Sequence, residues 1–187
     1  MSAPPQIRRQ DLVMTPERTL DTLERGFCGR LSTIGADGYP YCVPLLYVWM
    51  DEKIYVHNAG VRGHLRTNVE REPRVCFEVD EPGQVYAYGR FECDASVSYR
   101  SVIVFGRAHI VEPQGIKQRF FEMLMAKYEK RDLGQPKGFF PRLNQITCYA
   151  VTIERMTGKE IPLPDISMQW PQFDRTKSPK AVPPSQL

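Results

Sequence analysis

Hydrophobic and polar residues alternate with a period of two over much of the chain, which is the pattern of half-buried β-strands. The alternating stretches are residues 30–34, 41–49, 53–57, 75–79, 85–93, 101–111 and 148–154. Asp37 with Gly38 marks one tight turn, and Asp51 with Glu52 marks the next. The first three strands are therefore expected to form an antiparallel meander.

Two prolines in these stretches carry further information. Pro44 lies within the second stretch and cannot donate a ladder hydrogen bond, so it predicts a sheet edge or a bulge at that point. Pro82 is followed by Gly83, and this pair predicts a turn between the fourth and fifth strands.

Three shorter segments have the helical period instead. Thr15 suits the N-cap and Pro16 the first position of a helix that ends before Gly26. Two more helices are expected at residues 65–71 and 116–128. Most successive strands thus lack the intervening helix that a doubly wound parallel sheet needs. The pattern favours a mainly β protein with peripheral helices, folded as a six- or seven-stranded antiparallel β-barrel.

The length of 187 residues corresponds to about one domain. We expect an N-terminal extension at residues 1–14, the barrel domain at 15–161 and a proline-rich tail at 162–187. Trp170 and Phe173 in this tail are either docking anchors for a partner chain or exposed residues of an extended segment.

Composition narrows the class of protein further. The net charge of +3 is too small to predict a nucleic-acid partner, although it is compatible with a bound phosphate. The longest near-apolar run, at residues 41–50, is shorter than the roughly 20 residues of a membrane span. No apolar stretch follows the N-terminal arginines, as it would in a signal peptide. The five cysteines contain no CxxC pair, which supports neither a disulfide framework nor a zinc site. We expect a cytoplasmic protein that binds no metal, membrane or nucleic acid.

Two local features are candidates for chemistry. His57 ends a predicted strand and can exchange a proton near neutral pH, although it is also compatible with a simple strand end. The loop that follows contains Arg62, Gly63, His64 and Arg66 just before a predicted helix. Glycine, helix N-terminal amides and guanidinium groups together suit a phosphate, and a solvated basic turn is the alternative.

The order of several stretches identifies a resemblance. They are GRLST at 29–33, VPLLY at 43–47, IYVHNA at 54–59, EPRVCFEV at 72–79 and YRSVIVFGRA at 99–108. The chain resembles the pyridoxamine 5′-phosphate oxidase-related flavin-binding family, and within it most resembles the 5-nitroimidazole resistance (Nim-type) branch. The similarity covers about residues 15–154.

This resemblance implies a split β-barrel homodimer with FMN at the subunit interface. The residues implied at the cofactor are Arg30, Leu31, Ser32, Thr33, Pro44, Leu45, Tyr47, His57, Asn58, Arg62, Gly63, His64, Arg66, Ser101 and Val102. Members of the family usually carry a lysine after the loop glycine, where this chain has His64. A guanidinium of Arg62 or Arg66 can replace its charge. The alternatives are a weakened affinity for FMN, a different flavin or a different ligand.

The function implied is that of an FMN-dependent oxidoreductase resembling a nitroreductase. Reduced flavin would pass a hydride or electrons to a small aromatic acceptor such as a nitroimidazole. Tyr47 or Trp49 would stack on this acceptor, and His57 would donate a proton. The alternative is a non-catalytic flavin- or haem-binding module for storage or sensing. A pyridoxamine phosphate oxidase proper would need a second basic cluster for its substrate, and the sequence offers none.

Overall fold

The computed structural model describes residues 6–128, 134 and 136–170. The helices are α1 (Pro16–Arg25), α2 (His64–Arg71) and α3 (Gln114–Tyr128), with short 3-10 turns η1 (Gln10–Leu12), η2 (Leu143–Gln145) and η3 (Ile166–Met168). The strands are β1 (Gly29–Ile34), β2 (Pro40–Leu45), β3 (Tyr47–Met50), β4 (Lys53–Ala59), β5 (Arg74–Ala87), β6 (Ala95–Val111) and β7 (Ile146–Ile161).

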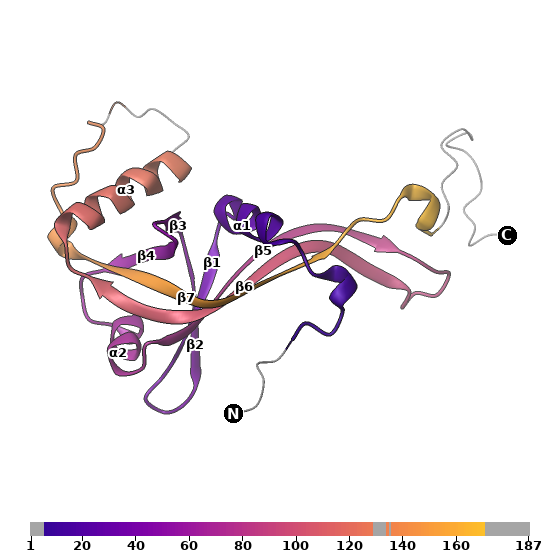
Figure 1. The fold of residues 1–187 in the computed structure, drawn as a ribbon, viewed down its shortest axis with the longest axis horizontal. Coiled ribbons are helices and arrows are strands. Elements are labelled where there is room, and N and C mark those ends of the chain that lie inside the picture. Colours follow the sequence, from indigo (N-terminus) through magenta and orange to yellow (C-terminus); the bar gives the residue numbers. More distant parts are fainter. Residues whose placement is uncertain (1–5, 129–133, 135, 171–187) are drawn as a thin grey trace.

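These strands form one seven-stranded sheet in the order β2-β1-β5-β6-β7-β4-β3 (Figure 1). Every neighbouring pair is antiparallel. The predicted split β-barrel fold is confirmed. Pro44 lies on β2, which is an edge strand, so its missing N–H leaves no gap between two paired strands.

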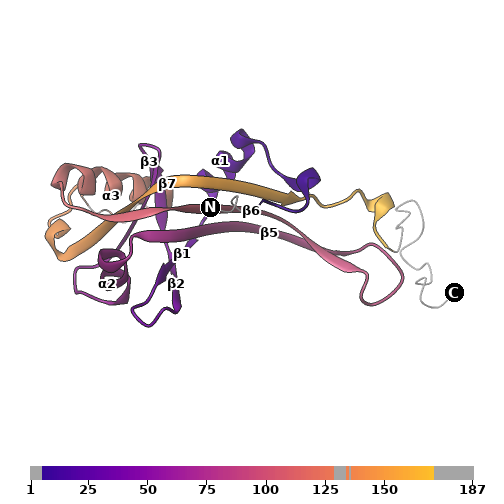
Figure 2. The same cartoon turned by 60° about the horizontal axis from the view of Figure 1, so that its bottom comes forward.

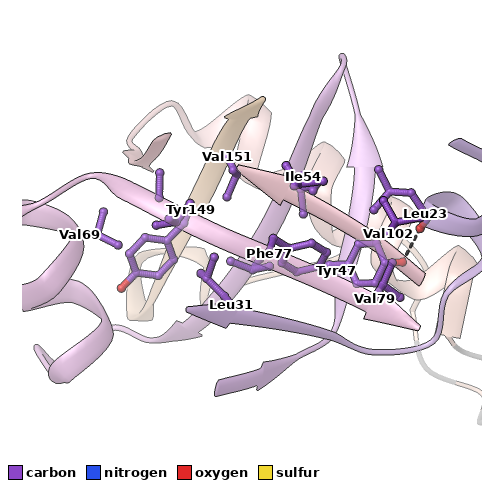
Figure 3. Close-up of a cluster of buried hydrophobic side chains, with 14 of the residues drawn as sticks. Leu23, Leu31, Tyr47, Ile54, Val69, Phe77, Val79, Val102, Tyr149 and Val151 are labelled. Atoms are coloured by element: carbon purple, nitrogen blue, oxygen red, sulfur yellow. Dashed lines mark hydrogen bonds between the residues drawn. The ribbon is translucent and has the colours of Figure 1, made fainter. Parts of the chain in front are cut away.

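The inner face of the coiled sheet holds the main hydrophobic core (Figure 3). Tyr47 and Phe77 lie at its centre with their ring centroids 5.0 Å apart. Leu23 of α1 closes one part of this core, and Leu65 and Val69 of α2 close another. Each large side chain that is fully buried there contributes roughly 1.5–3 kcal/mol through the hydrophobic effect.

The outer face of the same sheet is divided into two halves. Helix α3 packs over one half through Phe120 and Leu124. The residues beneath it, which we call the covered half, are Val48, Met50, Tyr55, Val111, Cys148 and Ala150. The other half, which we call the open half, lies on β2, β1, β5 and β6. Cross-strand register places on it Arg30, Ser32, Cys42, Pro44, Cys76, Glu78, Asp80, Ser101, Ile103 and Phe105.

Beyond the end of β1, strands β5 and β6 continue away from the barrel as a long ribbon (Figures 1 and 2). We call residues 81–100 of this ribbon, together with 162–170, the arm. The two parts meet where the N–H of Trp170 donates to the carbonyl of Ala87 at 2.8 Å. The arm exposes large apolar side chains, which are Val85, Tyr88, Phe91, Val97, Leu163, Ile166, Met168 and Trp170.

Several predicted boundaries were wrong. Strand β6 begins at Ala95 instead of residue 101, and β7 spans Ile146–Ile161 instead of 148–154. The stretch 41–49 is two strands rather than one, because the chain leaves the ladder at Leu46. There the Tyr128 hydroxyl accepts from the N–H of Tyr47 at 3.2 Å and donates to its carbonyl at 3.0 Å. This hydroxyl satisfies backbone groups that a continuous strand would have paired.

The turn predicted at Pro82 and Gly83 is also absent. Strand β5 runs through these residues to Ala87 and absorbs them as a register shift opposite β6. The Ser98 hydroxyl supports this irregular stretch by accepting from the N–H of Gln84 at 2.9 Å. The turn lies instead at residues 88–94 and replaces most of the strand predicted at 85–93.

The first helix begins after Thr15, whose side chain accepts from the N–H of Arg18, as predicted. Just before it, Met14 is buried and its N–H donates to the carbonyl of Gly158. Phe173 lies outside the described residues. None of the described helices is both long and apolar enough to cross a membrane.

Candidate functional site

Strand alternation divides the predicted cofactor residues between the two faces of the sheet. Arg30 and Ser32 of β1 lie on the open half, while Leu31 and Thr33 between them point into the interior and are buried. The same division separates the partly exposed Ser101 from the fully buried Val102 on β6. Pro44 is exposed, whereas Leu45 packs against the core. Only alternate members of each predicted run can present side chains to a ligand on the open half.

Tyr47 is a core residue in this structure. Its hydroxyl donates to the carbonyl of Leu23, as the dashed line in Figure 3 shows. The Nζ atom of Lys127 lies 3.8 Å from the centroid of its ring, and Phe77 contacts the ring edge-on. Burial raises the pKa of the phenol. The ring of Tyr47 is fully buried and therefore inaccessible to a stacking acceptor, whereas the ring of Trp49 is only partly buried against the core.

The open half combines paired charges with partly exposed apolar groups. The Arg30 guanidinium contacts the carboxylates of Glu78, at 3.0 Å, and Asp80. Burial raises the pKa of Glu78, while the hydrogen bond from Arg30 lowers it. On the neighbouring strand Ile103 and Phe105 are 37% and 38% exposed. A face of this composition is suited to a flat ligand or to a second protein surface.

The N-terminal end of α2 is uncapped and uncrowded. Gly63 is the N-cap, no side chain caps the helix, and no other residue lies within 4 Å of the position of a Cβ at Gly63. Its φ of −123° is one that any residue adopts, so the glycine provides room rather than an unusual backbone conformation. The first amides of the helix are accessible to an anion.

Two arginines of this segment share one carboxylate. Glu70 contacts Nη2 of Arg62 at 2.5 Å and Nε of Arg66 at 2.9 Å. The hydrogen bond from Arg66 lowers the pKa of Glu70. Sequence reasoning missed Glu70, although its spacing of four residues from Arg66 on a helix is a signal for such a pair. The carboxylate occupies the guanidinium groups that a phosphate would use.

A polar pair lies beside this cluster. The Tyr149 hydroxyl donates to Oδ1 of Asn58 at 3.2 Å. Burial raises the pKa of Tyr149, and the charges of Arg66 and Glu70 also act on it. Tyr149 therefore connects Asn58 of β4 to the charged groups of α2. Tyr149 was not predicted, because nothing in its local sequence distinguishes it from the other residues of β7.

His57 lies on the opposite side of β4 from Asn58. Its ring packs edge-on against Phe120 and Phe121, with centroids 5.5 and 5.0 Å away. Its Nδ1 atom is buried and has no hydrogen-bond partner in the described part of the chain. Burial lowers the pKa of this imidazole. The structure thus places His57 beneath α3, apart from Asn58 and the arginines.

A cleft of about 460 Å³ separates the β1–β2 turn from α2. His64 belongs to this cleft as well as to the first turn of the helix, and its ring lies edge-on to Tyr41 at 5.3 Å. The cleft therefore adjoins the anion-accessible end of α2.

The donor set at α2 fits a phosphate group. Guanidinium groups and accessible helix amides are the usual partners of a phosphate monoester. In the described residues, by contrast, His, Cys, Asp and Glu side chains form no cluster able to hold a metal ion.

Comparisons with known proteins identify the family of this chain. Residues 15–160 match the family described as pyridoxamine 5′-phosphate oxidase. Among curated proteins no match was found.

Several solved structures share the fold. One is a candidate 5-nitroimidazole antibiotic resistance protein from Bacteroides thetaiotaomicron, with 19% identity, a TM-score of 0.66, and coverage of 80% of this chain and 86% of that one. A FAD-binding protein from Mesorhizobium loti has 24% identity and a TM-score of 0.58, with coverage of 80% and 97%. A flavocytochrome from Azotobacter vinelandii has 18% identity and a TM-score of 0.69, with coverage of 85% and 73%. With a family match over most of its length and this fold, the chain belongs to the pyridoxamine 5′-phosphate oxidase family.

Proposed function

We propose that this protein binds a flavin phosphate, FMN being the form that the sequence resemblance implies, with the phosphate at the first turn of α2. The observation that carries the proposal is the pair of guanidinium groups, from Arg62 and Arg66, beside an uncapped helix end. Family membership supports it, as do similar folds in a FAD-binding protein and a flavocytochrome. On binding, the phosphate displaces Glu70 from one or both arginines.

We further propose a homodimer with the flavin between the two subunits. The support is the open half, where Ile103 and Phe105 are partly exposed, and the arm, where Val85 and Phe91 are 78% and 61% exposed. A two-stranded ribbon is marginally stable alone, and exposed apolar patches of this kind are usually covered by a partner. A two-fold axis would let each subunit cover the other in the same way.

The reaction we propose is reduction of a small aromatic acceptor. A bound flavin supplies the redox chemistry, and the protein supplies binding, orientation and exclusion of water. The Bacteroides protein of similar fold makes a nitroimidazole-type compound the first acceptor to test. Arg62 and Arg66 hold the phosphate, Asn58 offers an amide beside it, and Arg30 and Ser32 line the open half.

The first experiment is an absorbance spectrum of the freshly purified protein, with the released cofactor identified by mass. We expect a flavin spectrum and the mass of FMN, or a flavin spectrum after FMN is added to colourless protein. A colourless protein that does not bind added FMN would overturn the proposal.

Arg66→Ala tests the phosphate site itself. The variant should bind FMN at least tenfold more weakly, because a charge-assisted contact is lost. Arg74→Ala is the matched control, since its guanidinium pairs with Glu72 beyond the other end of α2. Equal affinities of Arg66→Ala and the unmodified protein would remove Arg66 from the site.

Turnover separates an enzyme from a storage or sensor module. The reduced flavin should be reoxidised faster by a nitroaromatic acceptor in the absence of oxygen than by oxygen alone. His57→Ala, with flavin retained, should slow this step if the histidine supplies a proton. An unchanged rate would end that role, which the packing of His57 beneath Phe120 does not favour.

A further inference from the structure

The cleft between the β1–β2 turn and α2 adjoins the proposed phosphate site. The phosphate is the terminal group of FMN, so a bound FMN has no further group that would extend from the phosphate into the cleft. Its volume of about 460 Å³ is within the range of small-molecule sites. One wall is formed by Tyr39, Pro40 and Tyr41, and the other by His64, Thr67 and Asn68. A group that enters it from the phosphate would pass His64.

The walls of the cleft are fixed in place by hydrogen bonds. Arg71 of α2 donates to the carbonyls of Ile34, at 2.6 Å, and Gly35. The Asn68 amide donates to the Thr33 hydroxyl at 3.0 Å, and both side chains are buried. The turn and the helix therefore keep their separation without a ligand. A preformed site of this kind loses little entropy when it binds.

The side chains of the cleft suit a flat base with polar edges. Tyr39 is 74% exposed, so its ring is available for stacking. The Asp37 carboxylate, which accepts from the N–H of Tyr39 at 3.1 Å, also lines the cleft. Its remaining lone pairs can accept from an amino group of a base or from ribose hydroxyls. An acceptor carboxylate and a tyrosine ring beside a phosphate site are complementary to a nucleoside.

We propose that this cleft binds the purine nucleoside of an adenine dinucleotide whose phosphate lies at the start of α2. This inference rests on the proposed function and extends it. The nucleoside can come from a dinucleotide flavin, FAD, or from a nicotinamide dinucleotide that donates electrons. The two sources share the same chemistry, with the base on Tyr39 and hydrogen bonds to Asp37.

Binding titrations with FMN, FAD, ADP and NADPH test the proposal in the intact protein. Tyr39→Ala should weaken at least one adenine-containing ligand about tenfold, because base stacking is lost, and leave the affinity for FMN unchanged. Phe139→Ala is the matched control, since it removes a 65% exposed aromatic ring beside α3, and it should change neither affinity. An equal effect of Tyr39→Ala on FMN and FAD, or no effect on any adenine-containing ligand, would overturn the proposal.

The same titrations separate the sources and the two proposals. FAD that binds more tightly than FMN, with the difference lost in Tyr39→Ala, identifies the flavin as the source. Tyr39-dependent binding of ADP and NADPH, with FAD no tighter than FMN, identifies the electron donor. If ADP binds through Tyr39 while neither flavin binds, the cleft proposal holds and the flavin function fails. If FMN binds and Tyr39→Ala affects no adenine-containing ligand, the reverse is true.

Discussion

The covered and open halves of the outer surface belong to the same sheet, yet they are built differently. Beneath α3, the covered half contains apolar and small side chains that pack against Phe120 and Leu124. The open half carries the Arg30–Glu78 ion pair beside Ile103 and Phe105, which remain more than one-third exposed. No described segment of this chain covers the open half as α3 covers its counterpart.

The difference shows that the same alternation of hydrophobic and polar residues can give a buried or an accessible face. Which of the two results depends on whether another segment packs against that face. Strands on both halves alternate in the same way, and their inward residues enter one core. Their outward residues differ in polarity. Those of the covered half are shielded from water by α3, whereas those of the open half remain accessible. A half-apolar surface with its charges already paired can be buried at a modest desolvation cost.

The largest expected effect comes from removing the cover. Phe120→Ala should lower the free energy of unfolding by about 3–5 kcal/mol, because a fully buried phenyl group leaves a cavity. Phe105→Ala on the open half should cost less than about 1 kcal/mol in the isolated subunit. Urea denaturation at two protein concentrations measures both. A cost for Phe105→Ala that grows with concentration would support subunit contact there, and equal losses for the two variants would contradict the comparison.

A charge placed on the open half tests the proposed dimer. Ile103→Asp should weaken subunit association by about 2 kcal/mol, close to a thirtyfold increase in the dissociation constant. Sedimentation velocity over a dilution series measures this change. Met123→Asp on α3, where the methionine is 39% exposed, is the control and should leave association unchanged. An Ile103→Asp protein that associates like the unmodified one would place the interface elsewhere.

At the start of α2, the arginines of the proposed phosphate site are likewise paired with a carboxylate. Glu70→Gln should strengthen FMN binding several-fold, because Arg62 and Arg66 no longer need to exchange a carboxylate for the phosphate. Fluorescence titration of FMN measures the change, and Glu72→Gln, which removes the partner of Arg74, serves as the control. Weaker binding in Glu70→Gln would mean that Glu70 positions the arginines instead of competing for them.

The smallest effect concerns His57, the half-buried histidine that packs against α3. Burial lowers the pKa of His57 in the folded state, so the unfolded state binds a proton first as the pH falls. Stability should be complete above about pH 6.5, decline as the pH falls toward the folded-state pKa, and then level off. Urea midpoints between pH 8 and pH 5 measure this decline.

His57→Gln should remove part of that decline. His109 is more exposed, and its pKa is lowered by burial and by Lys53, so His109→Gln should remove less. A pH dependence that is identical in His57→Gln and the unmodified protein would show that the imbalance in proton binding arises elsewhere.

Local sequence was sufficient for most of the elements. Thr15 and Pro16 marked the start of α1, and Pro44 marked a sheet edge or a bulge, of which the structure has the edge, because capping and the loss of an N–H act within a few residues. The same local rules failed at Pro82 and Gly83, where β6 pairs with β5 on both sides of the irregularity. Pairing with a strand distant in sequence outweighed the preference of two residues for a turn.

The candidate site was foreseen only in part. The cluster of Arg62, Gly63, His64 and Arg66 is contiguous, so the sequence could reveal it, and the structure keeps it together at the start of α2. The position of His57 beneath Phe120 depends on where α3 returns to the sheet, more than fifty residues later. Nothing near His57 in the sequence records that contact.

The sequence alone therefore determined the antiparallel barrel, an edge or bulge at Pro44 and a basic loop before a helix, since periodicity, capping and charge are properties of neighbouring residues. Tertiary structure alone decided which half of the outer face α3 covers, which predicted residues face inward, and that a cleft flanks His64. These outcomes depend on register and packing between segments far apart in the chain. Long-range contacts of this kind are set by the free energy of the whole fold, which no short stretch of residues encodes.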